Sequence, residues 1–174
     1  ISNGGEFVKN NVENIIPNES KVQLSFKNEN FSFDKVVISA GSWSKSLTRE
    51  IGDDFPLDTE RGYHVLFNNY ELINRPLGWS QSGFYLVQLA EGLRAAGTVE
   101  IAGLSKPENK KRTKMIENQA RKLLPQLNEV KSTWLGFRPT MPDALPVIGQ
   151  SQKNKNIIYG FGHQHIGWTL GAVT

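Results

Sequence analysis

Two short apolar segments that each run into a glycine constrain the fold of this chain more than any other feature. Residues 36–40 precede Gly41, and residues 157–161 precede Gly162. Apolar runs with little alternation are typical of strands covered on both faces, so both segments are predicted as buried strands of one α/β layer. The long stretch between them has a different pattern, which indicates a second domain inserted into the first.

Turn-forming residues divide the amino-terminal part of the chain into short strands. Strands are predicted at residues 12–16, 22–26 and 31–33, which favours a β-meander leading into the buried strand. The serines that follow Gly41 are suited to cap a short helix over residues 42–47. We assign residues 1–54 to this first domain and expect residues 146–174 to return to it.

The middle of the chain, residues 55–145, is expected to be the inserted domain, so the predicted fold class is α+β. An amphipathic helix is predicted to begin at Pro107 and to end before Pro125. Its apolar stripe is expected to contain Met115, Ile116, Ala120, Leu123 and Leu124. The strands predicted for an antiparallel sheet are residues 59–67, 83–88, 93–102 and 130–139.

Composition excludes several kinds of site. The chain has no cysteine, which rules out disulfides, a thiolate zinc site and a cysteine nucleophile, and fits a cytoplasmic protein. Its three histidines show no metal-ligand spacing with the carboxylates, so no metal is expected. The basic residues from Lys106 to Lys114 are interrupted by Glu108, which favours a solvated helix face over a nucleic-acid site.

Arg138 lies in the segment GFRPTMPDALPVIG, where three prolines follow it. Proline restricts the backbone, so this arginine is expected on a stiff loop that loses little freedom on binding a ligand. The planar guanidinium suits a carboxylate. A structural ion pair with Asp143 or another acid explains the same residue equally well, and the sequence leaves both interpretations open.

A second segment, YGFGHQHIGWTL, begins at Tyr159 and combines glycines with a predicted helix start at Gly167. Glycines allow a flat ligand to approach the backbone closely, and the positive end of a helix would stabilise negative charge on that ligand. The alternative is a tight turn that needs glycine for its backbone angles.

Five segments in this order resemble the D-amino acid oxidase family of FAD-dependent oxidoreductases. They are VVISAGSWS from Val36, LDTERGYH from Leu57, AGTVE from Ala96 and the two segments above. The form TERGYH is most similar to bacterial D-amino acid dehydrogenases. The resemblance implies FAD as cofactor and oxidative deamination of a D-amino acid to a 2-oxo acid and ammonia. A glycine- or sarcosine-type oxidase of the same family and a non-catalytic carboxylate-binding module remain as alternatives.

The resemblance also implies roles for individual residues. Arg138 would bind the substrate carboxylate, Tyr63 would make a second polar contact unless it is a half-buried strand tyrosine, and His163 would lie near the substrate. His163 and His165 are expected to shape the pocket rather than to transfer protons, because hydride transfer needs mainly orientation and a neutral amine. The implied cofactor contacts are Val12, Ala40, Gly41, Trp43, Gly162, Gly167, Trp168 and Thr169.

The Gly-x-Gly-x-x-Gly turn with which this family binds the FAD diphosphate does not occur in the sequence. With Ile1 in place of an initiator methionine, this predicts a carboxyl-terminal fragment that by itself binds FAD weakly or not at all. The dehydrogenase branch implies a respiratory electron acceptor and a position at the inner face of the bacterial cytoplasmic membrane. No residue pattern points to a particular acceptor or to an oligomeric state.

Overall fold

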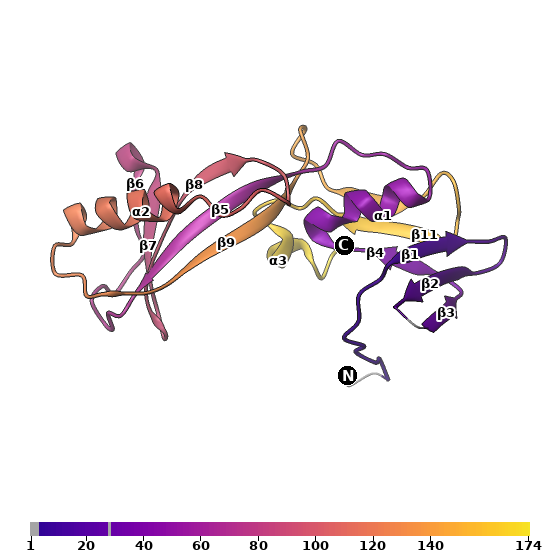
Figure 1. Cartoon of the computed structure of the whole chain (residues 1–174), viewed down its shortest axis with the longest axis horizontal. Coiled ribbons are helices and arrows are strands. Elements are labelled where there is room, and N and C mark those ends of the chain that lie inside the picture. The colour runs from indigo at the N-terminus through magenta and orange to yellow at the C-terminus, as the bar shows by residue number, and fades with distance from the viewer. Residues whose placement is uncertain (1–3, 28) are drawn as a thin grey trace. The chain divides into compact units, whose positions relative to one another are not determined.

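The chain forms two compact units, labelled by element in Figure 1. The computed structural model describes residues 4–27 and 29–174. Unit 1 comprises Ile1–Leu57 and Pro139–Thr174, and unit 2 comprises Asp58–Arg138. The α+β class is as predicted. The predicted domain boundaries followed residues 54 and 145, and the assignment of these domains to cofactor and substrate binding remains a prediction.

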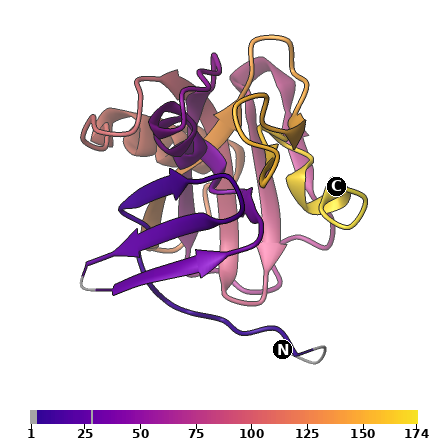
Figure 2. The same ribbon diagram turned by 90° about the vertical axis from the view of Figure 1, so that its right-hand side faces the viewer.

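Unit 1 contains a three-stranded antiparallel meander, which Figure 2 shows with its strands side by side. Its strands are β1 (Asn14–Pro17), β2 (Val22–Phe26) and β3 (Glu29–Phe33). The side chain of Asn18 closes the first turn, because its Oδ1 accepts hydrogen bonds from the backbone N–H groups of Ser20 and Lys21. The predicted meander is therefore confirmed.

The second sheet of unit 1 joins distant parts of the chain in the order β10-β11-β4. Strand β11 (Ile157–Phe161) runs parallel to β4 (Val36–Ile38) and antiparallel to β10 (Val147–Gln150). The expectation that both apolar segments belong to one layer is confirmed. The expectation that both faces of β4 are covered is wrong at Val37, which is 58% exposed.

Three short helices complete unit 1. They are η1 (Gly41–Trp43), α1 (Ser44–Glu50) and α3 (Gly167–Leu170). The predicted serine cap is wrong, since Trp43 occupies the N-cap of α1 and the hydroxyl of Ser46 donates to the Trp43 carbonyl oxygen instead. The buried apolar core of this unit consists of Ile15, Val22, Ile38, Ile51, Leu57, Met141, Ile157, Tyr159 and Phe161.

Asp53 ties the loop after α1 to the second sheet of unit 1. Its Oδ2 accepts hydrogen bonds from the hydroxyl groups of Tyr159, at 2.7 Å, and of Ser151, at 2.5 Å. Both hydroxyl-bearing residues are buried. Burial raises the pKa of Tyr159 to about 12, and the adjacent Asp53 carboxylate contributes to the rise.

This raised pKa predicts a loss of stability at alkaline pH that a Tyr159→Phe variant should not show. A tyrosine that titrates near 10 when unfolded and at about 12 when folded holds its proton more tightly in the native state. Its contribution is fully present below the unfolded pKa and is lost as pH rises through the folded one. Urea unfolding of the full-length protein at a series of pH values measures this. A wild-type-minus-variant difference that stays constant through that interval would contradict the prediction.

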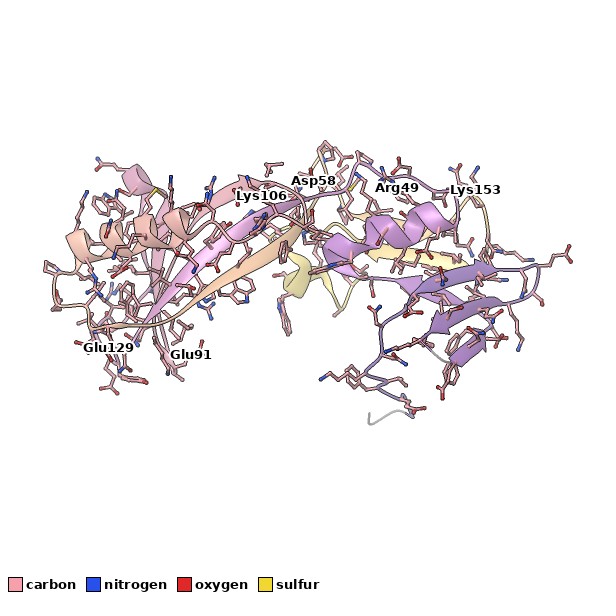
Figure 3. All side chains as sticks on the ribbon, in the orientation of Figure 1. Arg49, Asp58, Glu91, Lys106, Glu129 and Lys153 are labelled. Carbon is pink, nitrogen blue, oxygen red and sulfur yellow. The ribbon has the colours of Figure 1, made fainter. Side chains whose placement is uncertain are left out.

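Unit 2 is built on a five-stranded sheet in the order β6-β7-β8-β5-β9. Asp58 begins β5 at one end of the sheet, and Glu91 lies in the hairpin turn at the other end (Figure 3). The short strand β6 was not predicted. The strands are β5 (Asp58–Phe67), β6 (Leu77–Trp79), β7 (Phe84–Leu89), β8 (Gly92–Ile101) and β9 (Val130–Thr140), with the single-turn helix η2 (Ser80–Ser82) before β7.

The helix of unit 2, α2 (Lys110–Leu123), begins later than predicted. Asn109 is its N-cap, and the side-chain oxygen of this residue accepts a hydrogen bond from the backbone N–H of Lys111. Pro107 therefore precedes the helix instead of opening it, because the asparagine side chain satisfies an N–H group that would otherwise lack a partner.

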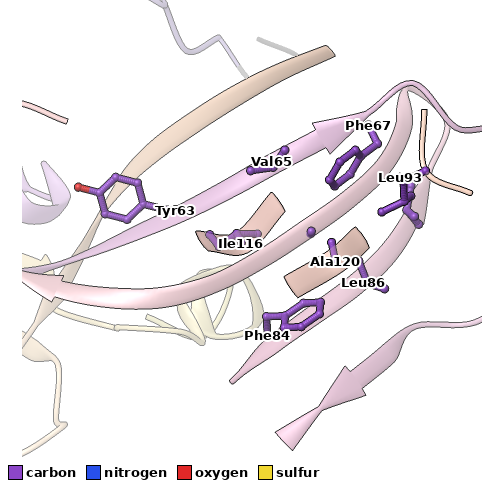
Figure 4. Packing of buried hydrophobic residues seen from close by; sticks show 10 residues of the cluster. Tyr63, Val65, Phe67, Phe84, Leu86, Leu93, Ile116 and Ala120 are labelled. Atoms are coloured by element: carbon purple, nitrogen blue, oxygen red, sulfur yellow. The ribbon is translucent and has the colours of Figure 1, made fainter. Parts of the chain in front are cut away.

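One face of α2 packs on the sheet through Ile116 and Ala120, as the close view in Figure 4 shows. The predicted stripe is wrong at Met115 and Leu123, which are 45% and 38% exposed. The buried core of unit 2 consists of Tyr63, Val65, Phe67, Phe84, Leu86, Leu93, Ala95, Ile116, Ala120 and Leu127. In the described part of the chain, no helix is both long and apolar enough to span a bilayer.

Candidate functional site

A cavity of about 420 Å³ opens in unit 1 where β4 and β11 end. These two strands are parallel, so the residues after them meet at the same edge of the sheet. Gly41 follows β4, Gly162 follows β11, and both line the cavity together with Gly167 and Trp168 of α3. The sequence had placed these four residues at a cofactor, and the structure brings them together.

Glycine is required at this edge for backbone shape and for space. Gly162 has a φ of +83°, and a Cβ atom there would lie 3.0 Å from the Cγ of Met141. Gly41 has a φ of +56°, and a Cβ atom there would meet no atom within 4 Å, so it would project into open space. The backbone at Gly41 thus borders open space that a side chain would fill, which suits the approach of a flat ring system, whereas Gly162 is buried against Met141.

Gln164 holds the loop after β11 in place. Its backbone N–H donates to the carbonyl oxygen of Pro139, at 3.2 Å, and its side-chain Nε2 donates to that of Met141, at 3.1 Å. His163 Nε2 lies 3.0 Å from the hydroxyl of Thr174. Pro139, His163 and Gln164 line the cavity, so these contacts hold parts of its wall in place.

A neighbouring cavity of about 480 Å³ continues the same edge of unit 1. It shares Ser39, Gly160, His163, Gly167 and Gly171 with the first. Helix α3 borders both cavities but comprises a single turn, so its dipole places less positive charge on a ligand than a longer helix would. Close backbone approach is therefore the stronger argument for a ligand here.

The other predicted cofactor residues have different surroundings. Val12 packs against the core of unit 1. Ala40 and Thr169 adjoin lining residues in the chain, and Trp43 lies two positions after Gly41, but none of the three lines the 420 Å³ cavity. His163, predicted near the substrate, does line it, as does His165. Sequence reasoning missed the lining residues Ser39, Gly160 and Gln164, whose only signal was their place next to the predicted glycines and histidines.

Arg138 lies in strand β9 of unit 2, so the expected loop is wrong and its rigidity comes from the sheet. Its Nη1 lies 3.0 Å from Oε2 of Glu60 on the neighbouring strand β5. The sequence left Asp143 or another acid as the possible partner, and the structure shows Glu60. Oδ1 of Asp143 instead accepts a hydrogen bond from the backbone N–H of Leu145. The Arg138 and Glu60 side chains remain 26% and 25% exposed.

Tyr63, the second predicted substrate contact, is buried in unit 2 and its hydroxyl is engaged inside the fold. The hydroxyl donates to Oε2 of Glu100 at 2.6 Å and accepts from the backbone N–H of Asn109 at 3.2 Å. Burial raises the pKa of Tyr63, and the bond to the Glu100 carboxylate adds to the rise. A substrate contact by this hydroxyl remains a prediction, and it would compete with these two bonds.

Three cationic side chains lie near the Glu100 carboxylate that accepts the hydrogen bond from Tyr63. Its carboxylate lies 3.7 Å from Nε of Arg61, 3.4 Å from Nζ of Lys106 and 3.8 Å from Nε of Arg112. The hydrogen bond from Tyr63, followed by that from Lys106, lowers the pKa of the Glu100 carboxyl group. Sequence reasoning missed this cluster, because the register of β5 against β8 is what pairs Arg61 with Glu100.

Arg61 is fully buried. Its Nη2 donates to the carbonyl oxygen of Pro107 at 3.0 Å, and its guanidinium carbon lies 5.7 Å from the centre of the Phe137 ring. In the described part of the chain, Nε and Nη1 find no hydrogen-bond acceptor, so the charge of Arg61 depends on the nearby Glu100 carboxylate. The described residues contain no group of three or more His, Asp or Glu side chains that could hold a metal ion.

Comparison with known sequences gives the relatives of the chain. A sequence profile of the family described as "DAO: FAD dependent oxidoreductase" matches residues 1–174. A D-amino-acid oxidase of Bradyrhizobium diazoefficiens is 43% identical over 148 residues, which are 81% of this chain and 35% of that protein. A D-amino acid dehydrogenase of Vibrio cholerae is 33% identical over 146 residues, 80% of this chain and 34% of that protein. The chain thus spans about a third of the length of these relatives.

Comparison with solved structures gives the fold. Glycine oxidase from Geobacillus kaustophilus matches 94% of this chain and 45% of its own, with a TM-score of 0.81 and 22% identity. Iminodiacetate oxidase from Chelativorans matches 99% of this chain and 48% of its own, with a TM-score of 0.81 and 16% identity. At these identities the likeness shows the shared fold alone.

Proposed function

The chain belongs to the DAO family of FAD-dependent oxidoreductases, and from this premise we propose that the whole protein oxidises D-amino acids. The product would be an imino acid, which hydrolyses to a 2-oxo acid and ammonia. The observation that carries the proposal is the glycine-bordered cavity at the shared edge of β4 and β11. The substrate class is supported by the sequence relatives, which are named as acting on D-amino acids.

FAD fits the residues of this cavity. The partly exposed backbone at Gly41 and Gly160 would hold the cofactor, with Gly162, Gly167 and Trp168 beside it. When bound, FAD supplies the acceptor for the hydride of the substrate. Because the family's diphosphate-binding turn is absent from residues 1–174, we expect these residues alone to bind FAD weakly or not at all.

The substrate would be oriented by unit 2. Arg138 would donate charge-assisted hydrogen bonds to the α-carboxylate, which fixes the direction of the Cα–H bond. The next residue in the chain, Pro139, lines the cavity of unit 1. Tyr63 would make a second polar contact to the substrate in competition with its bond to Glu100, and His163 would shape the cavity rather than transfer a proton.

The flavin absorbance of the full-length protein provides a test of this proposal. Mixed without oxygen, a D-amino acid should bleach the absorbance of the oxidised flavin, whereas its L-enantiomer should leave it unchanged. Bleaching by glycine or sarcosine but by no D-amino acid would favour the glycine-type oxidase instead. A protein that binds no flavin would favour a carboxylate-binding module.

The electron acceptor is a separate question for the same protein. One relative is named an oxidase and the other a dehydrogenase. Hydrogen peroxide formed in air would assign oxygen as the acceptor. Turnover that requires an added quinone, and activity that sediments with membranes, would support the respiratory acceptor and the position at the cytoplasmic membrane that the dehydrogenase branch implies.

A further inference from the structure

We propose that Glu60 makes the substrate site selective against D-amino acids with an acidic side chain. This inference rests on the proposed function, in which Arg138 binds the α-carboxylate of the substrate. Oε2 of Glu60 lies 3.0 Å from Nη1 of Arg138, so the residue that anchors the substrate already carries one carboxylate. A substrate bound at Arg138 is therefore held beside a fixed negative charge.

Glu60 lies on the open face of the unit 2 sheet. Burial alternates along β5, where Thr59 and Arg61 are buried and Glu60 and Gly62 are partly exposed. Successive side chains of a strand point to opposite faces, so Glu60 and Gly62 share the face opposite to α2. One quarter of the Glu60 side chain is exposed, which leaves it within reach of a ligand.

Gly62 shapes the surroundings of the guanidinium. A Cβ atom on this residue would lie 3.6 Å from Nη2 of Arg138, so the guanidinium lies over the glycine. Glu60 contacts the guanidinium through Nη1, and Nη2 is the atom next to the glycine. A guanidinium has five N–H donors, enough for Glu60 and a substrate carboxylate together.

On the side of strand β8, the neighbours of Glu60 on this face are apolar. In the register of β5 with β8, Ile101 is opposite Glu60 and Val99 is opposite Gly62. Ile101 is 64% and Val99 49% exposed on this face. Apolar neighbours solvate a charge poorly, so the Glu60 carboxylate acts on a nearby ligand more strongly than it would among polar side chains.

The sign of the selectivity follows from this charge. A second carboxylate on the substrate is repelled by Glu60, a neutral side chain is unaffected, and a cationic side chain is attracted. Because the pair is partly exposed, solvent and salt screen the effect, and we expect about a tenfold preference in kcat/KM. D-Glutamine and D-glutamate report it directly, since they differ in charge but hardly in size.

The test uses the full-length protein with bound FAD and its Glu60→Gln variant. Glutamine keeps an oxygen that accepts a hydrogen bond from Arg138 but removes the charge, so the preference for D-glutamine over D-glutamate should fall about tenfold. Glu91→Gln is the matched control, because Glu91 also pairs with an arginine, Arg94, at 3.4 Å. Glu91 lies at the end of unit 2 opposite to Asp58, where β5 begins (Figure 3), and its variant should keep the wild-type preference.

Two outcomes would contradict the role of Glu60 without contradicting the proposed function. One is normal oxidation of D-amino acids by Glu60→Gln with a preference within about twofold of wild type. The other needs no variant: the wild-type preference should weaken as salt is added, and a preference that salt leaves unchanged is not electrostatic. Glu60→Asp should retain the selectivity. If the wild-type protein oxidised no D-amino acid, the proposed function would fail and this inference with it.

Discussion

Replacing Arg138 by alanine in the full-length protein should lower kcat/KM for D-amino acids about 100-fold, chiefly through a higher KM. A hydrogen bond to a charged group contributes about 1.5–3 kcal/mol, and the guanidinium can make two to one carboxylate. Arg138→Lys keeps the charge but loses the planar fork, so we expect a smaller loss of about tenfold. A kcat/KM that rises from alanine to lysine to arginine at position 138 would indicate carboxylate binding.

Steady-state kinetics with a neutral D-amino acid measure this effect. Arg75→Ala is a suitable control, because Arg75 is exposed and lies outside the strands of unit 2. Flavin absorbance should be equal in all variants, which separates a substrate effect from a loss of cofactor. An unchanged KM in Arg138→Ala would show that the arginine serves the ion pair with Glu60 and not the substrate.

Replacing Glu100 by alanine should strongly destabilise unit 2, because it leaves the charge of fully buried Arg61 without a counter-charge. The variant also removes the acceptor for the buried Tyr63 hydroxyl. Glu100→Gln keeps an acceptor for that hydroxyl and should cost less. Adding Arg61→Met to Glu100→Gln should recover part of the loss, since a buried ion pair exchanged for apolar atoms is often nearly neutral.

Urea unfolding of the full-length protein measures these differences. Glu117→Ala is the control, since Glu117 pairs with Lys114 and Arg121 along the surface of α2 and such pairs contribute about 0.3–0.5 kcal/mol. The folded-state pKa of Glu100 is lowered, so its stabilisation is present above the unfolded pKa and is lost as pH falls through the folded one. A Glu100→Ala protein as stable as the control would contradict the role of the cluster.

The sequence predicted the elements whose signal is local. The bounds of β2 and β11 were as expected, because each is a short β-rich run between turn residues. That β4 and β11 belong to one layer was also expected, since both run into glycine, and the structure shows them directly paired. Strands β6 and β10 were missed: one has three residues and the other contains Gly149, so neither offers a clear period.

The sequence predicted the parts of the site that lie after strand ends and missed the parts that depend on the register between strands. Gly162 directly follows one of two parallel strands and Gly41 comes shortly after the other, so their meeting could be foreseen. The partner of Arg138 could not be predicted, because Glu60 comes from a strand far away in the sequence. For the same reason nothing local distinguished the burial of Arg61 from that of an ordinary exposed arginine.

The parallel pairing of β4 with β11 also sets an order of assembly for the growing chain. Unit 2 is one uninterrupted stretch, so its contacts become available as soon as Arg138 has left the ribosome. Strand β4 is synthesised earlier, yet it must wait for β11 before its sheet is complete. Closing a loop of that length is entropically costly. Folding of unit 2 first would lower this cost, because β5 and β9 at its two ends are neighbours in its sheet.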